Sequence, residues 1–114
     1  MRLNNKFLTI TCLLIIIVSC ASMIRIRYIE ERPRDFHDKQ VTLIGYVDKV
    51  ITLPILGIGV YQLDDGTGKI WVKPAGDAPY KGKRVTVTGV IKVGLTISGK
   101  TFGLILIEKK KGEN

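Results

Sequence analysis

A short stretch near the middle of the 114-residue chain constrains the fold more than any other. It contains two runs in which apolar residues alternate, with Tyr61 and Leu63 on one face of the first run and Ile70 and Val72 on one face of the second. Between the runs lies the segment 64–68, Asp-Asp-Gly-Thr-Gly, whose aspartates can accept backbone hydrogen bonds and whose glycines tolerate positive φ. The stretch therefore predicts a β-hairpin with a five-residue loop.

Composition favours one small all-β domain. The chain has room for a single domain, and 25% charged with 46% hydrophobic residues is typical of a globular protein. Removing residues 1–19 takes away two of the 18 basic residues and none of the 10 acidic ones, which lowers the net charge from +8 to +6. Such a charge favours binding to anionic surfaces, such as nucleic acid, acidic lipid or acidic polysaccharide. The alternative is that the charge only keeps a small domain soluble, which the scattered positions of the lysines favour.

Residues 1–20 have the layout of a secretory signal. Arg2 and Lys6 give a positive start, and an apolar run of twelve residues follows from Phe7 to Val18. Because about 20 apolar residues are needed to span a bilayer, a cleaved signal peptide is a better interpretation than a transmembrane anchor.

The end of this segment, Ile17-Val18-Ser19-Cys20, resembles the lipobox of bacterial lipoproteins. The resemblance implies that Cys20 becomes the first mature residue and carries lipid, which attaches the protein to a membrane of the bacterial cell envelope. Ala21, rather than Asp, follows the cysteine, which favours the outer membrane in a cell that has two. The segment departs from the family at Ile17 and Val18, where Leu and a smaller residue are preferred. The alternative is ordinary cleavage after Ala21, which would discard Cys20.

The hairpin pattern Tyr-x-Leu-x-Asp-Gly-Thr-Gly-x-Ile-x-Val resembles the central hairpin of OB-fold domains. These small Greek-key barrels occur in single-strand nucleic-acid binders and in bacterial secreted proteins. The resemblance covers about residues 41–107 and implies an all-β, five-stranded OB-fold barrel. The predicted organisation is a lipoprotein signal peptide over residues 1–19, the lipidated cysteine with a tether and leading segment over residues 20–40, and the OB-fold domain over residues 41–114.

The first long strand of the barrel is expected at residues 41–47. Val41, Leu43 and Val47 would face inward, and Gly45 would permit a sharp bend. The same pattern returns at residues 85–90, where Gly89 is the matching bend. Between them, two Pro and two Gly within residues 74–82 argue against the helix that many OB folds have there.

Apolar and basic side chains alternate in the segment before the barrel. Over residues 21–32 the apolar members are Ile24, Ile26 and Tyr28, and the basic ones between them are Arg25 and Arg27. This alternation predicts a leading strand or an extended tether. Pro33 ends the run, and residues 34–40 are polar, which indicates a loop with room for one helical turn.

An OB barrel usually binds through strands two and three and through the loops that join strand one to strand two and strand four to strand five. Trp71 and Tyr46 alternate with inward residues, so both should face outward, where an aromatic ring can stack on a single-stranded base for about 1–3 kcal/mol. The alternative is that Trp71 covers the barrel rim. The candidate binding set also includes an aromatic residue and three cations, namely Tyr61, Lys49, Lys69 and Lys92.

Two apolar segments are expected to join the strands, at residues 50–59 and 93–99, and neither contains Lys or Arg. Exposed apolar loops mark protein or membrane contacts, whereas loops that contact nucleic acid need cations. The candidate contact residues here are Leu53, Ile55, Leu56 and Leu95. The alternative is that these segments extend the strands and pack together.

No pattern indicates catalysis, a metal or another cofactor. One His and two Cys exclude a Cys/His zinc site, and no base–nucleophile pair accompanies the neighbouring acids Asp64-Asp65 and Glu30-Glu31. The sequence therefore predicts a lipid-anchored, extracytoplasmic OB-fold binding module that engages another envelope protein. The alternatives are a binder of single-stranded nucleic acid or an anionic polymer, and a structural lipoprotein without a dedicated ligand.

Overall fold

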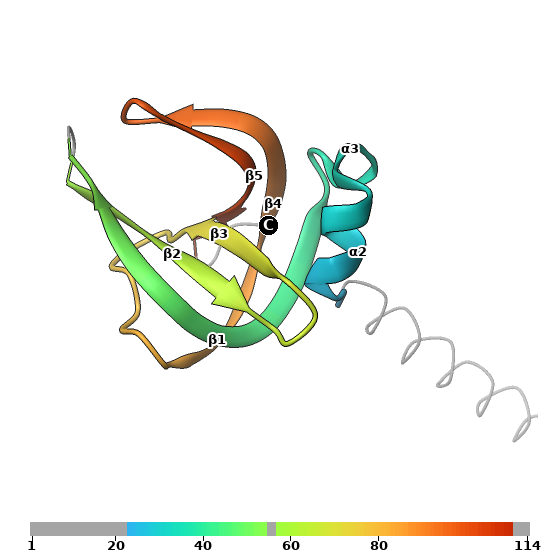
Figure 1. The fold of residues 1–114 in the computed structure, drawn as a ribbon, viewed down its shortest axis with the longest axis horizontal. Helices are drawn as coiled ribbons and strands as arrows, with labels where there is room; N and C mark the ends of the chain where they lie inside the picture. Colours follow the sequence, from blue (N-terminus) through green and yellow to red (C-terminus); the bar gives the residue numbers. More distant parts are fainter. Residues whose placement is uncertain (1–22, 55–56, 111–114) are drawn as a thin grey trace, which may run out of the picture.

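The structure is a computed structural model that describes residues 23–54 and 57–110, so the predicted lipidation site Cys20 and the loop residues Ile55 and Leu56 lie outside the described part. Five strands close into a barrel in the order β1-β2-β3-β5-β4 (Figure 1). The strands are β1 (Gln40–Leu53), β2 (Ile58–Asp64), β3 (Lys69–Lys73), β4 (Arg84–Ile97) and β5 (Lys100–Glu108), and two short helices, α2 (Ile26–Glu31) and α3 (Pro33–Phe36), precede them. The chain is an all-β protein with a five-stranded OB-type barrel, as predicted.

The central hairpin has the predicted register. Tyr61 pairs with Val72, and Leu63 pairs with Ile70. Because Asp64 still pairs with Lys69, the loop between the strand ends is four residues long, one fewer than predicted.

Gly45 and Gly89 are both points where two backbones approach closely. A Cβ on Gly45 would lie 2.5 Å from the carbonyl oxygen of Asp64, and one on Gly89 would meet the carbonyl oxygen of Ile107. Both positions therefore require glycine because there is no space beside either strand, and the sharp bend expected at each stays a prediction. The expected inward residues of β1, including Leu43 and Val47, are buried in the core.

The predicted leading strand is wrong, because residues 26–31 form the helix α2. Ile26 and Ile29 are fully buried, whereas Tyr28, which the alternation grouped with Ile26, is exposed. Residues three apart share one face of a helix, so this pair faces the barrel together. Among the described residues of this segment, Met23 alone keeps a strand-like pairing, a parallel bridge to Thr42 of β1.

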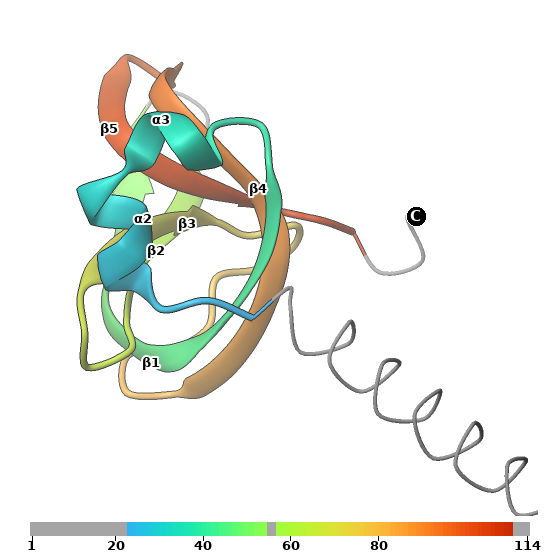
Figure 2. The same cartoon turned by 90° about the vertical axis from the view of Figure 1, so that its right-hand side faces the viewer.

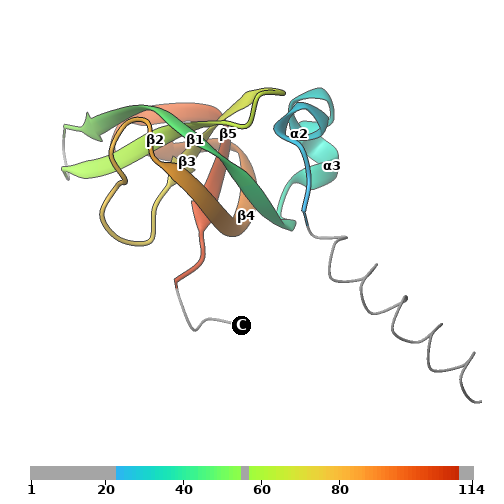
Figure 3. The same cartoon turned by 90° about the horizontal axis from the view of Figure 1, so that it is seen from below.

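α2 closes one end of the barrel. Ile26 and Ile29 belong to the same buried cluster as Leu43, Leu63 and Ile70. As predicted, no helix forms within residues 74–82, and the N-terminal helix covers the barrel end instead. In Figure 3, α2 and α3 lie at one end of the barrel, and the paired ends of β1 and β2 extend at the other. No helix in the described ranges is both long and apolar enough to cross a bilayer.

Candidate binding surface

Two hairpin arms extend from the barrel at the end opposite α2 (Figure 1). Arm 1 is formed by residues 49–54 and 57–60 of β1, β2 and their connection, and arm 2 by residues 93–102 of β4 and β5. A second apolar cluster joins the two arms and is distinct from the barrel core. Its buried members are Leu53, Val60, Phe102 and Ile105, and its partly buried members are Ile51, Ile58, Trp71, Leu95, Ile97 and Ile107.

The described parts of the two apolar segments therefore extend the strands and pack together, which is the second of the alternatives left open by the sequence. Leu53 is only 2% exposed, so its assignment to an exposed contact patch is wrong. Leu95 is half-buried in the same cluster. Ile55 and Leu56 lie outside the described residues.

Trp71 lies on the outer side of β3 and packs against the arms. The edge-on ring of Phe102 has its centroid 5.8 Å from that of Trp71. Lys49 Nζ lies 5.6 Å and Lys100 Nζ 5.2 Å from the ring centroid, distances at which an ammonium is attracted to the π-electrons. Trp71 thus contributes to the second cluster, and the side chains of both arms contact its ring.

Tyr61 is buried in the barrel core and forms no part of the arm surface. It shares a face with Leu63, as the sequence indicated, but that face is the interior of the barrel, and Tyr61 is 2% exposed. Burial raises the pKa of the Tyr61 hydroxyl, and the negative charge of Glu108 raises it further.

Two of the three predicted lysines are held by carboxylates outside the Trp71 surface. Lys69 Nζ donates to Asp48 Oδ2 at 3.2 Å, and Lys92 Nζ donates to Asp38. The hydrogen bond from Lys92 holds the pKa of the Asp38 carboxyl below its usual value. Of the three predicted lysines, Lys49 contacts Trp71. A lysine outside the predicted set, Lys100, contacts the ring as well, and its contact requires the hairpin register that brings arm 2 over β3.

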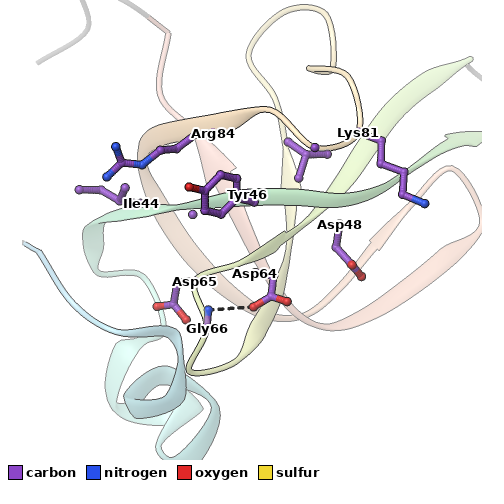
Figure 4. Close-up of a pocket in the computed structure, with 11 residues that line it drawn as sticks. Ile44, Tyr46, Asp48, Asp64, Asp65, Gly66, Lys81 and Arg84 are labelled. Atoms are coloured by element: carbon purple, nitrogen blue, oxygen red, sulfur yellow. Dashed lines mark hydrogen bonds between the residues drawn. The ribbon is translucent and has the colours of Figure 1, made fainter.

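Tyr46 faces outward, as predicted, and is 57% exposed. It lies in an open depression of about 550 Å³, shown in Figure 4, which includes neither Trp71 nor the side chains around it. Lys81 and Arg84 lie on one side of Tyr46, and three aspartates lie on the other (Figure 4). The structure therefore separates the two outward aromatic residues that the sequence grouped together.

The aspartates of the hairpin loop accept hydrogen bonds from nearby donors. Asp64 Oδ1 accepts from the N–H of Gly66 at 2.8 Å, and Asp65 Oδ1 accepts from the N–H groups of Thr67 and Gly68 and from the Thr67 hydroxyl. Burial acts to raise the pKa of Asp65, but these bonds and one from the N–H of Ile26 outweigh it and hold that pKa below its usual value. Both carboxylates thus order the loop.

Comparison with known proteins bears on the fold alone. No protein-family model matches the sequence, and a search of curated proteins gave no match. Similar chains were found among solved structures. One is described as "OBody AM3L09 bound to hen egg-white lysozyme"; it is 15% identical, the match covers 67% of this chain and 81% of that chain, and the TM-score is 0.49.

Proposed function

We propose that this chain is a lipid-anchored, extracytoplasmic OB-fold binding module that engages another protein of the bacterial envelope through its two arms, without catalysis. The observation that carries this proposal is the apolar cluster that joins the arms through Leu53, Val60, Phe102 and Ile105. A surface that is already ordered loses less conformational entropy when it binds than a pair of flexible loops does.

The chemistry of the arm surface suits a protein partner. Residues 50–59 and 93–99 contain no charged side chain. Val50, Thr52, Pro54 and Thr96 are exposed along the described parts of the arms. Nucleic-acid backbones are bound by neutralising phosphates with cations, whereas the centre of a protein interface is depleted of charge.

One observation favours a second candidate, the binding of single-stranded nucleic acid or another anionic polymer. Lys49 and Lys100 converge on Trp71 at the base of the arms, which combines two positive charges with an aromatic ring. Stacking of a base on Trp71 would require these lysines to move from the ring. We therefore rank this function below binding of an envelope protein.

Site-specific photocrosslinking in intact cells tests the proposed partner surface. A photoreactive amino acid at Thr96, exposed on arm 2, is expected to give a discrete adduct with one envelope protein. The same amino acid at Arg34, exposed on α3 at the other end of the barrel, is the matched control and should not give that adduct. Val50→Glu should reduce the Thr96 adduct, because it buries a charge in the interface.

Either of two results would contradict this function. One is the same adduct from both positions. The other is no adduct from Thr96, together with binding of a single-stranded oligonucleotide that weakens steeply as salt rises, which would favour the second candidate.

The anchor has an independent test. Cys20→Ser should abolish incorporation of radiolabelled fatty acid and release the protein from washed membranes, since several acyl chains, each adding about 0.8 kcal/mol per buried methylene, provide stable anchoring. Fatty-acid labelling of the Cys20→Ser protein, or its full retention on washed membranes, would contradict lipid anchoring through this cysteine.

A further inference from the structure

The first described residues lie along the free edge of β1. Met23 forms a parallel bridge with Thr42, and the N–H of Ile24 donates to the Thr42 carbonyl at 3.3 Å. Met23 is 49% exposed. Cys20 is three residues before Met23 in the sequence, a span of at most about 11 Å even when the chain is fully extended. If Cys20 carries lipid, the surface around Met23 is therefore held close to the bilayer.

Two surfaces of the barrel adjoin Met23, and they differ in charge. The outer side of α2 is mixed, because Arg27 forms an ion pair with Glu31 at 2.9 Å and Glu30 is exposed next to them. The other surface is the outward side of the sheet formed by residues 40–46 of β1 and residues 84–90 of β4, which we call the β1–β4 face. Four cross-strand pairs form it: Gln40–Val90, Thr42–Thr88, Ile44–Thr86 and Tyr46–Arg84.

The β1–β4 face has no acidic residue among these pairs, and basic residues surround it. Arg25 lines a shallow groove with Met23 and Ile44, and Lys81 and Arg84 line the depression around Tyr46. At the other end of the face, the N–H of Lys109 donates to the Thr88 carbonyl at 2.9 Å. In Figure 2, the end of β5 emerges beyond β4 on the right-hand side of the view.

Three aspartates lie beside this face and accept bonds within the protein, and Asp48 is the one of the three that pairs with a lysine. The depression around Tyr46 also contains Asp48, Asp64 and Asp65. Asp48 is paired with Lys69, and Asp64 and Asp65 accept hydrogen bonds within the hairpin loop and from α2. The basic side chains Lys81 and Arg84, by contrast, have no carboxylate partner in the described part of the chain.

We propose that the β1–β4 face is the membrane-docking surface of this protein and lies on anionic lipid headgroups. The inference rests on the proposed lipidation of Cys20 and extends it, because it states which side of the barrel meets the bilayer. Exposed Met23 and Tyr46 are suited to the interface, where Tyr is enriched, and Arg25, Lys81, Arg84 and Lys109 are attracted by the negative surface potential. This orientation leaves the arms free, since they extend at the opposite end from α2 and Met23.

The orientation can be measured on the full mature lipoprotein, purified from membranes and reconstituted into vesicles. The sequence contains Cys only at positions 12 and 20. Once the signal peptide is removed and Cys20 is lipidated, a single introduced cysteine is the one reactive thiol. Thr86→Cys places a fluorescent thiol label on the β1–β4 face, and Thr96→Cys, also an exposed threonine of β4, places it on arm 2 as the matched control.

In vesicles of phosphatidylcholine and phosphatidylglycerol, a lipid with a spin-labelled headgroup should quench the label at position 86 several-fold more than the label at position 96. The difference should shrink in pure phosphatidylcholine, and also when Lys81→Gln and Arg84→Gln are combined. Equal quenching at the two positions, stronger quenching at position 96, or quenching that is the same in neutral and anionic vesicles would overturn the proposal.

Thiol counting distinguishes this failure from failure of the anchor. One labelled thiol per chain and incorporation of radiolabelled fatty acid, with equal quenching at both positions, would leave lipidation intact and reject the orientation. A second labelled thiol at Cys20 would show that this cysteine carries no lipid and would overturn both the anchor and the orientation built on it.

Discussion

The backbone N–H of Ile26 donates a hydrogen bond of 2.9 Å to Oδ2 of Asp65, which lies 39 residues later in the chain. The residue before α2, Arg25, provides no side-chain cap, so the hairpin loop supplies the acceptor that a helix start requires. Glu30 of α2 completes the link by accepting a bond of 2.7 Å from the N–H of Lys69. The hairpin loop and the helix that closes the barrel therefore order each other.

Asp65→Asn should lower the free energy of unfolding at pH 7 by about 1–2 kcal/mol, the range for loss of a helix cap or a charged hydrogen bond. The amide removes the negative charge, and it cannot accept every bond that the two carboxylate oxygens accept. Urea denaturation of the variant and the wild type measures this difference. Asp77→Asn is the control, because Asp77 is exposed and should change the free energy of unfolding by less than about 0.5 kcal/mol.

The same carboxylate should make stability depend on pH. The pKa of Asp65 is lowered in the folded protein. The contribution of this carboxylate to the free energy of unfolding is therefore complete above the pKa of an unfolded Asp, about 3.9. That contribution is lost as the pH falls through the lower pKa of the folded protein. Urea denaturation at a series of pH values should therefore show that the difference in the free energy of unfolding between wild type and Asp65→Asn becomes smaller below about pH 4. A gap that stays constant through this range would contradict the assignment.

Gly89→Ala should destabilise the barrel by about 3 kcal/mol, because the added methyl group would meet the carbonyl oxygen of Ile107 and the side chain of Leu106. Thermal unfolding followed by circular dichroism measures the effect. Gly103→Ala is the matched control: it lies in β5, and an added Cβ there has no atom within 4 Å. Equal losses in the two variants would show that the close backbone approach does not set the requirement at position 89.

The barrel was predictable from the sequence because its strongest signals are local. The alternation through Leu63 and Ile70 indicates a hairpin without knowledge of any other segment, and the Val-Thr-x-x-Gly pattern before Gly45 and Gly89 identifies two related strands. The register also correctly placed Trp71 on the outer side of its strand. Tyr61 pairs with Val72 and shares the inward face with Leu63, so the same alternation argues against the binding role that the sequence analysis gave it.

The N-terminal helix and the arms depend on contacts between distant residues. The apolar residues Ile24, Ile26 and Tyr28 alternate as in a strand, but Ile26 and Ile29 also have helical spacing. The helix is the structure that forms because hydrogen bonds to Asp65 and Glu30 join this segment to the hairpin loop. Burial of Leu53 likewise requires Phe102, which reaches it only in the closed barrel. A single sequence shows neither contact.

Ile29→Ala should reduce the free energy of unfolding by about 2–5 kcal/mol, the usual cost of emptying a fully buried isoleucine site. Ile29 belongs to the same cluster as Leu43 and Leu63, so the prediction tests whether α2 is part of the barrel core. Chemical denaturation should show one cooperative transition with a lower midpoint. Tyr28→Ala, on the exposed side of the same helix, is the control, and a similar loss in that variant would mean that burial of Ile29 in the barrel core does not account for the effect.

Lys100→Ala should increase the access of solvent quenchers to Trp71. Trp71 is the single tryptophan of the chain, so its fluorescence reports this site alone. Lys100 Nζ lies 5.2 Å and Lys49 Nζ 5.6 Å from the ring centroid. Removing the Lys100 stem exposes the ring, and the quenching constant for acrylamide should rise. Lys92→Ala is the control, since Lys92 is paired with Asp38 outside the Trp71 surface and should leave the constant unchanged.

The same fluorescence separates the two candidate functions. Because Lys49, Lys100 and Phe102 already contact Trp71, a single-stranded oligonucleotide added to the wild-type protein at low salt should leave its emission unchanged. Base stacking on the ring would instead quench the emission, and added salt would restore it as phosphate contacts are lost. Quenching with that salt dependence would contradict our ranking and make polymer binding at Trp71 the leading function. If the emission is unchanged by the oligonucleotide while acrylamide still quenches it, the ring is accessible but binds no base. The arms then stay the proposed surface for a protein partner.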